Sequence, residues 1–191
     1  NFLKGVIFPI EEDREKRGGF SLISGAAKEV TKKAPGPSIF LAVDNTIHGT
    51  PEAYFSRGKN IIKVMNEMGF SALIVGPREF YYGMDTLSEL SQTAQFPFIS
   101  ANIVDENGNS PHFLKSYFIE PVTNTAVIGI SSDAVLTRNL PEHIEGIQVT
   151  DPKETVQKYA AQLEKTVNNI IVIYPGLKIS TPKEKEMAEE I

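Results

Sequence analysis

The segment Ser71-Ala-Leu-Ile-Val-Gly-Pro-Arg-Glu-Phe-Tyr-Tyr-Gly-Met-Asp-Thr-Leu-Ser-Glu-Leu90 decides the fold. Its apolar run from Ala72 to Val75 predicts a short buried strand, which Gly76-Pro77 ends. A polar tip follows, and then a helix whose apolar side is formed by Met84, Leu87, Leu90 and Ala94. A strand that ends in a glycine turn delivers polar groups to the carboxyl edge of a sheet, where α/β proteins build active sites.

The rest of the chain alternates in the same way, which predicts the α/β class. The charged run 11–17 is interpreted as a solvated turn, and residues 131–150 as irregular. No linker divides the sequence, so residues 1–191 are expected to form one domain. Further strands are expected at 6–10, 38–43, 96–104, 117–121, 126–130 and 169–173, the pair 117–121 and 126–130 as a hairpin. Further helices are expected at 18–34, at 50–69 and after the capping signatures at Asp151 and Thr181.

Composition excludes several classes of function. The chain has 191 residues, a net charge of −5 and no cysteine, so thiolate metal sites, disulfides and a cysteine nucleophile are ruled out. No basic stripe points to nucleic acid, and no apolar run reaches the length of a membrane span. Only three histidines are present, a scant supply for a site that binds two metals.

Several stretches resemble, in order, the framework motifs of the 5'-nucleotidase family of metallophosphoesterases. Gly76 to Gly83 is similar to the family's Gly-Asn-His-Glu-Phe-Asp-Tyr-Gly block. Leu41 to Pro51 resembles its Leu-Asp-Ala-Gly-Asp-Thr-Phe-Gln-Gly-Ser-Pro segment, and Phe96 to Asn102 its Phe-Pro-Val-Leu-Ser-Ala-Asn strand. The resemblance implies a four-layer αββα sandwich, in which two mixed sheets lie between helices and two divalent metals bind at the sheet ends.

The positions that the resemblance assigns to metal chemistry carry other residues here. The family's bridging aspartate falls on Asn45, with Asp44 one residue earlier, and its Asn-His pair falls on Pro77 and Arg78. A neutral amide cannot replace a bridging carboxylate, proline offers no side-chain donor atom, and arginine keeps its proton. Because paired divalent ions need deprotonated oxygen and imidazole ligands, these residues predict that the two-metal centre is lost.

The other family motifs lie toward the two ends of the sequence. The first, Asp-x-His, corresponds to Glu12 and Arg14, and the Ser-His pair after the last strand falls on Tyr174 and Pro175. The final Gly-His-x-His motif and the C-terminal substrate domain would lie beyond Ile191. The resemblance therefore implies a truncation at the C-terminus relative to the family.

Three side-chain groups have both a functional and a structural interpretation. Arg14 and Arg78 could form an anion site, or could pair with neighbouring carboxylates in place of lost metal. His48 could join Asp44 as a ligand or base, or be a hydrogen-bonded packing residue, the interpretation that we favour. The aromatic residues could stack on a nucleotide base, but core packing is the prediction for most of Tyr54, Phe55, Phe80, Tyr81 and Tyr82.

The leading prediction is a catalytically inactive domain of this family, without cofactor, that acts as a binding or structural module. The alternative is a residual phosphohydrolase whose single metal is held by Glu12, Asp44 and His48. The resemblance implies an exported setting, and an exposed sheet edge would suit an unknown protein partner or a homo-oligomer. The degenerate pocket is predicted to contain Glu12, Arg14, Asp44, Asn45, His48, Pro77, Arg78, Glu79, Tyr174 and Pro175.

Overall fold

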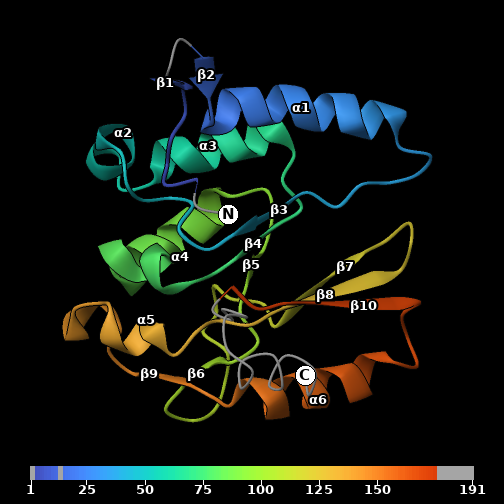
Figure 1. Cartoon of the computed structure of the whole chain (residues 1–191). Helices are drawn as coiled ribbons and strands as arrows, with labels where there is room; N and C mark the ends of the chain where they lie inside the picture. Colours follow the sequence, from blue (N-terminus) through green and yellow to red (C-terminus); the bar gives the residue numbers. More distant parts are fainter. Residues whose placement is uncertain (1–2, 13–14, 176–191) are drawn as a thin grey trace, which may run out of the picture.

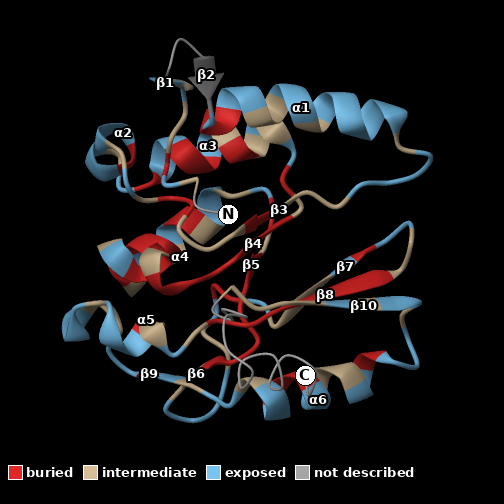
Figure 2. Ribbon diagram, viewed as in Figure 1, coloured by how far each residue is buried: buried red, intermediate tan, exposed pale blue. Residues whose placement is uncertain are grey.

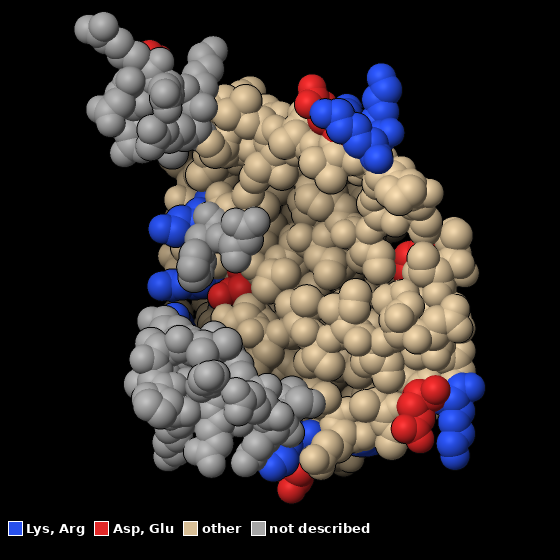
Figure 3. Space-filling view, turned by 45° about the vertical axis from the view of Figure 1, so that its right-hand side comes forward, with Lys and Arg blue, Asp and Glu red and all other residues tan. Residues whose placement is uncertain are grey.

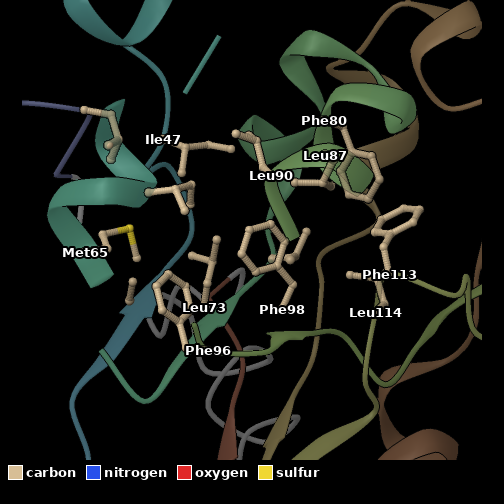
Figure 4. Packing of buried hydrophobic residues seen from close by; sticks show 14 of the residues in the cluster. Ile47, Met65, Leu73, Phe80, Leu87, Leu90, Phe96, Phe98, Phe113 and Leu114 are labelled. Carbon is tan, nitrogen blue, oxygen red and sulfur yellow. The ribbon is translucent and has the colours of Figure 1, made fainter. Parts of the chain in front are cut away.

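The computed structural model describes residues 3–12 and 15–175, which form layers of helices and sheets (Figure 1). One sheet has the order β3-β4-β5, all parallel, and its strands are Leu41–Val43, Ala72–Ile74 and Phe98–Ile99. Helices α1 (Gly19–Lys33), α3 (Lys59–Met68) and α4 (Met84–Thr93) contribute buried side chains to the core beside this sheet. Figure 4 shows Met65, Leu73, Leu90 and Phe98 in that core.

The second sheet has the order β10-β8-β7 and is mixed. Strands β7 (Tyr117–Glu120) and β8 (Thr125–Gly129) form the predicted antiparallel hairpin, and β10 (Asn169–Ile173) runs parallel to β8. Helix α6 (Pro152–Leu163) covers this sheet on the side away from α1 (Figure 1). The α/β class and the predicted four-layer αββα arrangement are therefore confirmed.

The two sheets approach closely because small and polar side chains lie between them. Ser131 donates its hydroxyl to the Val75 carbonyl oxygen at 2.6 Å, and its own amide donates to Asn102 Oδ1 at 2.7 Å. These groups are fully buried, and the central strands β4 and β8 are buried along their whole length (Figure 2). The serine and asparagine of the Ser100-Ala-Asn102 motif thus join the two layers.

Replacing Gly129 by alanine should destabilise the protein. An added Cβ would lie 2.8 Å from Ile99 Cγ2 and 3.1 Å from the Ile99 carbonyl oxygen, too close for packed atoms. We expect the free energy of unfolding to fall by about 1–3 kcal/mol, as for other overpacked interiors. Urea denaturation measures it, with Gly25→Ala on α1 as control, where an added Cβ would meet no described atom within 4 Å beyond its own helix backbone. An equal effect of both substitutions would contradict the close approach of the sheets.

The helix that was predicted over 50–69 is divided in two. Thr50 caps α2 (Pro51–Phe55) as expected, its hydroxyl accepting the amide hydrogen of Ala53 at 3.2 Å. Arg57 and Gly58 then adopt φ values of +48° and +83°, which no helix accommodates, and α3 starts afresh at Lys59. The cap at Asp151 is confirmed, since its carboxylate accepts the amide hydrogen of Glu154.

Two strand predictions were wrong. Residues 6–9 are not a strand, because the Val6 and Ile7 carbonyl oxygens accept the amide hydrogens of Phe20 and Ser21 at the start of α1. The charged run instead forms a hairpin of β1 (Ile10–Glu12) and β2 (Glu15–Arg17). The predicted strand 96–104 is two strands, since β6 (Ile103–Asp105) pairs with β9 (Ile147–Val149) in another sheet.

The segment that was predicted to be irregular contains, besides β9, the short helix α5 (Ala134–Thr137) and a 3-10 turn, η2 (Pro141–His143). The helix expected after Thr181 lies outside the described residues. Within the described ranges, no helix is both long enough and apolar enough to cross a bilayer.

Candidate functional site

The polar residues that follow β3 and β4 meet at one sheet edge, as the sequence predicts for adjacent parallel strands. Asp44 and Asn45 follow β3 and both have left-handed backbones, with φ of +46° and +49°. The 3-10 helix η1 (Pro77–Tyr82) follows β4. Asp44 donates its amide hydrogen to the Ile74 carbonyl oxygen at 3.0 Å, which fixes one loop against the other strand.

A segment near the start of the described chain holds the same loop from its other side. The amides of Lys4 and Gly5 donate to the carbonyl oxygens of Asn45 and Thr46, both at 2.8 Å. The Thr50 hydroxyl donates to the Gly5 carbonyl oxygen at 2.9 Å. The backbone around Asp44 and Asn45 is therefore fixed by residues distant in sequence.

Glu79 is the buried centre of this edge, with 1% of its surface exposed. Its carboxylate accepts the amide hydrogens of Thr46 at 2.7 Å and of Asn45 and Gly76 at 3.1 Å. Burial, and then the neighbouring Asp44, raise the pKa of Glu79 to about 8, against the opposing effect of these hydrogen bonds. Glu79 therefore joins the two loops through their backbones.

Asp44 lies against Gly76, and its Oδ1 is buried without a hydrogen-bond partner in the described part of the chain. A Cβ built on Gly76 would collide with the Asp44 carboxylate and lie 2.7 Å from its Cβ. Gly76 thus contacts one carboxylate and binds the other through its amide. The two carboxyl groups therefore lie close together at this edge, and the charge of Asp44 adds to burial in raising the pKa of Glu79.

Three more of the predicted residues, His48, Pro77 and Arg78, lie around this edge without forming a common ligand set. The His48 ring contacts the Tyr81 ring with centroids 3.8 Å apart and planes tilted by 41°, and burial and then the Arg78 charge lower the pKa of His48. Pro77 is buried, and its carbonyl oxygen accepts a hydrogen bond from Asn139 Nδ2 at 2.9 Å. Arg78 is half-buried and makes no ion pair within the described residues.

The other four predicted residues lie at the ends of the described ranges or outside them. Tyr174 packs against the core of the second sheet, and burial, then Asp133 and Asp151, raise its pKa. Pro175 is the last described residue. Glu12 ends β1, but its side chain and the whole of Arg14 are outside the description, so their place in the pocket stays a prediction.

The residues at this edge do not fit a centre of two divalent ions. Asn45 supplies only a neutral amide, Pro77 no donor atom, and Arg78 a fixed positive charge. Glu79 already receives three amide hydrogens and has little capacity left for a cation. Among residues 3–12 and 15–175, no group of three histidine or acidic side chains is placed to hold a metal.

The aromatic side chains differ from the sequence prediction of core packing. Phe80 is fully buried in the same core as Phe113 (Figure 4), but Tyr54, Phe55 and Tyr81 are 57%, 84% and 37% exposed. The exposed rings line a groove of about 800 Å³ between α2, η1 and the α5–η2 segment. Tyr54 and Phe55 are exposed because α2 ends after five residues and is too short to bury both rings, which the predicted single helix over 50–69 did not indicate.

Comparison with known proteins agrees with the fold and with the framework motifs found in the sequence. No protein-family model matches the chain. A 5'-nucleotidase of Vibrio vulnificus is 32% identical over 137 residues, which covers 70% of this chain and 25% of that protein. The crystal structure of a 5'-nucleotidase precursor from Thermus thermophilus has a TM-score of 0.73 at 24% identity, covering 90% of this chain and 34% of that one.

A calcineurin-like phosphoesterase from Bacillus subtilis has a TM-score of 0.72 at 19% identity, covering 90% of this chain and 58% of that one. This chain spans about a quarter of the length of the curated relatives that it matches. By sequence and by fold, the chain belongs to the 5'-nucleotidase-like metallophosphoesterases.

Proposed function

We propose that this chain is a phosphoesterase-family domain without two-metal hydrolysis, retained as a binding or structural module. The observation that carries the proposal is the donor set at the edge of β3 and β4. Asn45, Pro77 and Arg78 stand where the resemblance assigns metal chemistry, and none of them supplies an anionic ligand. Glu79 and Asn102 belong to the framework motifs that resemble the family, and both form hydrogen bonds with backbone groups within the fold.

One observation favours the alternative, a phosphohydrolase with a single metal. Asp44 Oδ1 is buried and lacks a partner among the described residues, and a carboxylate oxygen in that state is a good ligand for a hard cation. His48 and Glu12 would complete the set of ligands. Against this, the His48 ring packs against the Tyr81 ring, and burial and the charge of Arg78 lower the pKa of His48.

Calorimetric titration of the metal-stripped protein with Mn²⁺ and then Zn²⁺ separates the two proposals. We expect no stoichiometric binding tighter than about 10 µM, which corresponds to roughly −7 kcal/mol. A phosphodiester hydrolysis assay in the presence of each metal should remain at the background rate. Stoichiometric binding together with turnover that is lost in Asp44→Asn, but kept in Glu106→Gln, would establish the one-metal enzyme instead. Glu106 is an exposed carboxylate and serves as the matched control.

Three further parts of the proposal concern the setting of the domain. Residues 1–191 act as one domain, in an exported setting that the family resemblance implies. A protein partner or a second copy covers an exposed edge of the second sheet, where Ile171 of β10 is 40% exposed. Sedimentation over a range of concentrations tests the second copy, and a strictly monomeric mass would exclude it.

A further inference from the structure

A groove beside the sheet-edge site has the size and form of a small-molecule site. Its volume is about 800 Å³, within the range of roughly 300–1,000 Å³ that is usual for ligand pockets. Helices α2 and α5, which flank it, lie on the same side of the molecule in Figure 1. Asn139 Nδ2 donates to the carbonyl oxygens of Pro77 and Val135, both at 2.9 Å, and so fixes the α5–η2 wall against η1.

Aromatic rings form much of the wall and are open to solvent. Tyr54 and Phe55 meet edge to face, with centroids 5.7 Å apart, and Tyr81 and Tyr82 do so at 5.1 Å. These paired rings hold one another in fixed orientations while exposing flat apolar surface. Such exposed rings are suited to cover a planar ring, which would remove them from water at little cost in conformational entropy.

The groove is lined by basic side chains. Among the described residues, Arg57, Arg138 and His143 line it and no acidic residue does, although the chain as a whole has a net charge of −5. Within the described part of the chain, neither arginine has an ion pair. An unpaired guanidinium group binds phosphate or carboxylate oxygens through charge-assisted hydrogen bonds. In contrast to this basic groove, the face of the molecule shown in Figure 3 carries few charged side chains across its middle.

A phenol at the groove adds a second, independent sign of a missing partner. The Tyr82 hydroxyl is buried and has no hydrogen-bond partner among the described residues. Burial, reinforced by Tyr81 and Tyr54, raises the pKa of Tyr82 to about 12, so the hydroxyl keeps its proton and remains a donor. A buried donor without an acceptor costs stability, which an anionic oxygen would recover.

We propose that the groove binds a small planar aromatic molecule that carries a phosphate or carboxylate group. The ring packs on Tyr54 and Tyr81, and Arg57 and Arg138 hold the anion. The occupant is thereby defined by two features together, a flat ring and a negative charge. The inference does not depend on loss of metal catalysis, because none of these residues stands at a position where the resemblance assigns metal chemistry.

Titration with phenyl phosphate, followed by calorimetry and by tyrosine fluorescence in a chain without tryptophan, tests the proposal. We expect a dissociation constant of about 1 mM or below. Inorganic phosphate and benzyl alcohol, which carry the anion and the ring separately, should each bind at least about tenfold more weakly. If phenyl phosphate binds no more tightly than inorganic phosphate, the aromatic part of the proposal is overturned.

Variants assign the binding to the groove. Arg57→Gln and Arg138→Gln should each weaken phenyl phosphate binding about tenfold and leave benzyl alcohol binding unchanged. Lys63→Gln, which removes one positive charge from an exposed position on α3, should leave both unchanged. Tyr82→Phe should weaken binding of the anion severalfold without loss of stability.

Circular dichroism and thermal melting of every variant exclude misfolding as the cause. Equal binding by the wild type and both arginine variants would overturn the site. So would a concentration-dependent dimer that excludes phenyl phosphate, since the rings would then be an interface between copies of the chain.

Discussion

Gly76→Ala should destabilise the protein by about 3 kcal/mol, the upper end of what overpacking usually costs. Gly76 has φ of −118° and ψ of −173°, which alanine adopts freely, so the backbone is not the reason. The cause is the Asp44 side chain, because the new methyl group would overlap its carboxylate and Cβ. Neither residue 76 nor Asp44 can move away easily, because hydrogen bonds fix both backbones: the Gly76 amide donates to Glu79, and the Asp44 amide donates to the Ile74 carbonyl oxygen.

Asp44→Gly should rescue this variant. It removes the side chain with which the new methyl group at position 76 would overlap, and glycine adopts a φ of +46° without steric cost. Alone, Asp44→Gly should stabilise by about 1 kcal/mol, since it relieves a left-handed backbone and an unpaired buried oxygen. Asp44→Ala keeps the backbone cost and should gain less.

Chemical denaturation of the four members of this cycle measures the coupling, which we expect to be about 2 kcal/mol. Gly36→Ala is the control, because within the described part of the chain an added Cβ there would meet no atom within 4 Å beyond its chain neighbours. Strict additivity of Gly76→Ala and Asp44→Gly would refute the contact between these two residues.

Removing the Glu79 carboxylate should have the second large effect. Glu79→Ala leaves three amide hydrogens without an acceptor, those of Thr46 and Gly76, which are buried, and that of Asn45, which is partly buried. At about 1–3 kcal/mol for each unsatisfied group, the loss should reach 3 kcal/mol or more. Glu89→Ala removes an exposed carboxylate that pairs with Lys59 at 3.1 Å, and should cost less than about 1 kcal/mol.

The same carboxylate makes stability depend on pH. With a pKa raised from 4.5 to about 8 in the folded protein, Glu79 binds its proton more tightly when folded than when unfolded. Its contribution is therefore fully present below about pH 4.5 and lost as the pH rises through 8. The wild type should lose stability over this interval relative to Glu79→Gln, which cannot titrate. Parallel pH profiles of the two proteins would show that Glu79 is ionised throughout.

The features that the sequence predicted correctly depend on local chemistry. Thr50 and Asp151 are hydroxyl and carboxylate caps followed by proline, and each begins its helix where expected. The hairpin of β7 and β8 follows from two apolar runs with a short polar connection. Adjacent parallel strands bring Asp44 and Glu79 together, so the position of the candidate site also followed from the order of elements.

The features that were missed depend on contacts across long separations. Residues 6–9 have the apolar composition of a strand, yet carbonyl oxygens in this run accept hydrogen bonds from amides at the start of α1. Local strand propensity does not predict such a contact between separate segments. The exposure of Tyr54 and Phe55 follows from the break of the helix at Arg57, where a non-glycine residue takes a left-handed backbone. Burial of Glu79 likewise needs its three amide donors, which come from two separate loops.

The hydrogen bonds of Lys4 and Gly5 to the loop after β3 link this loop to other parts of the fold. The Gly5 carbonyl oxygen accepts a hydrogen bond from the Thr50 hydroxyl, and the Val6 carbonyl oxygen accepts one from the Phe20 amide. One short segment therefore connects the sheet edge, α2 and α1. Release of that segment would free the carbonyl oxygens of Asn45 and Thr46 and one cap of α1 in a single event. Hydrogen exchange at Lys4, Gly5 and Phe20 should then share one opening rate, and a protease that cleaves within this segment would loosen all three elements together.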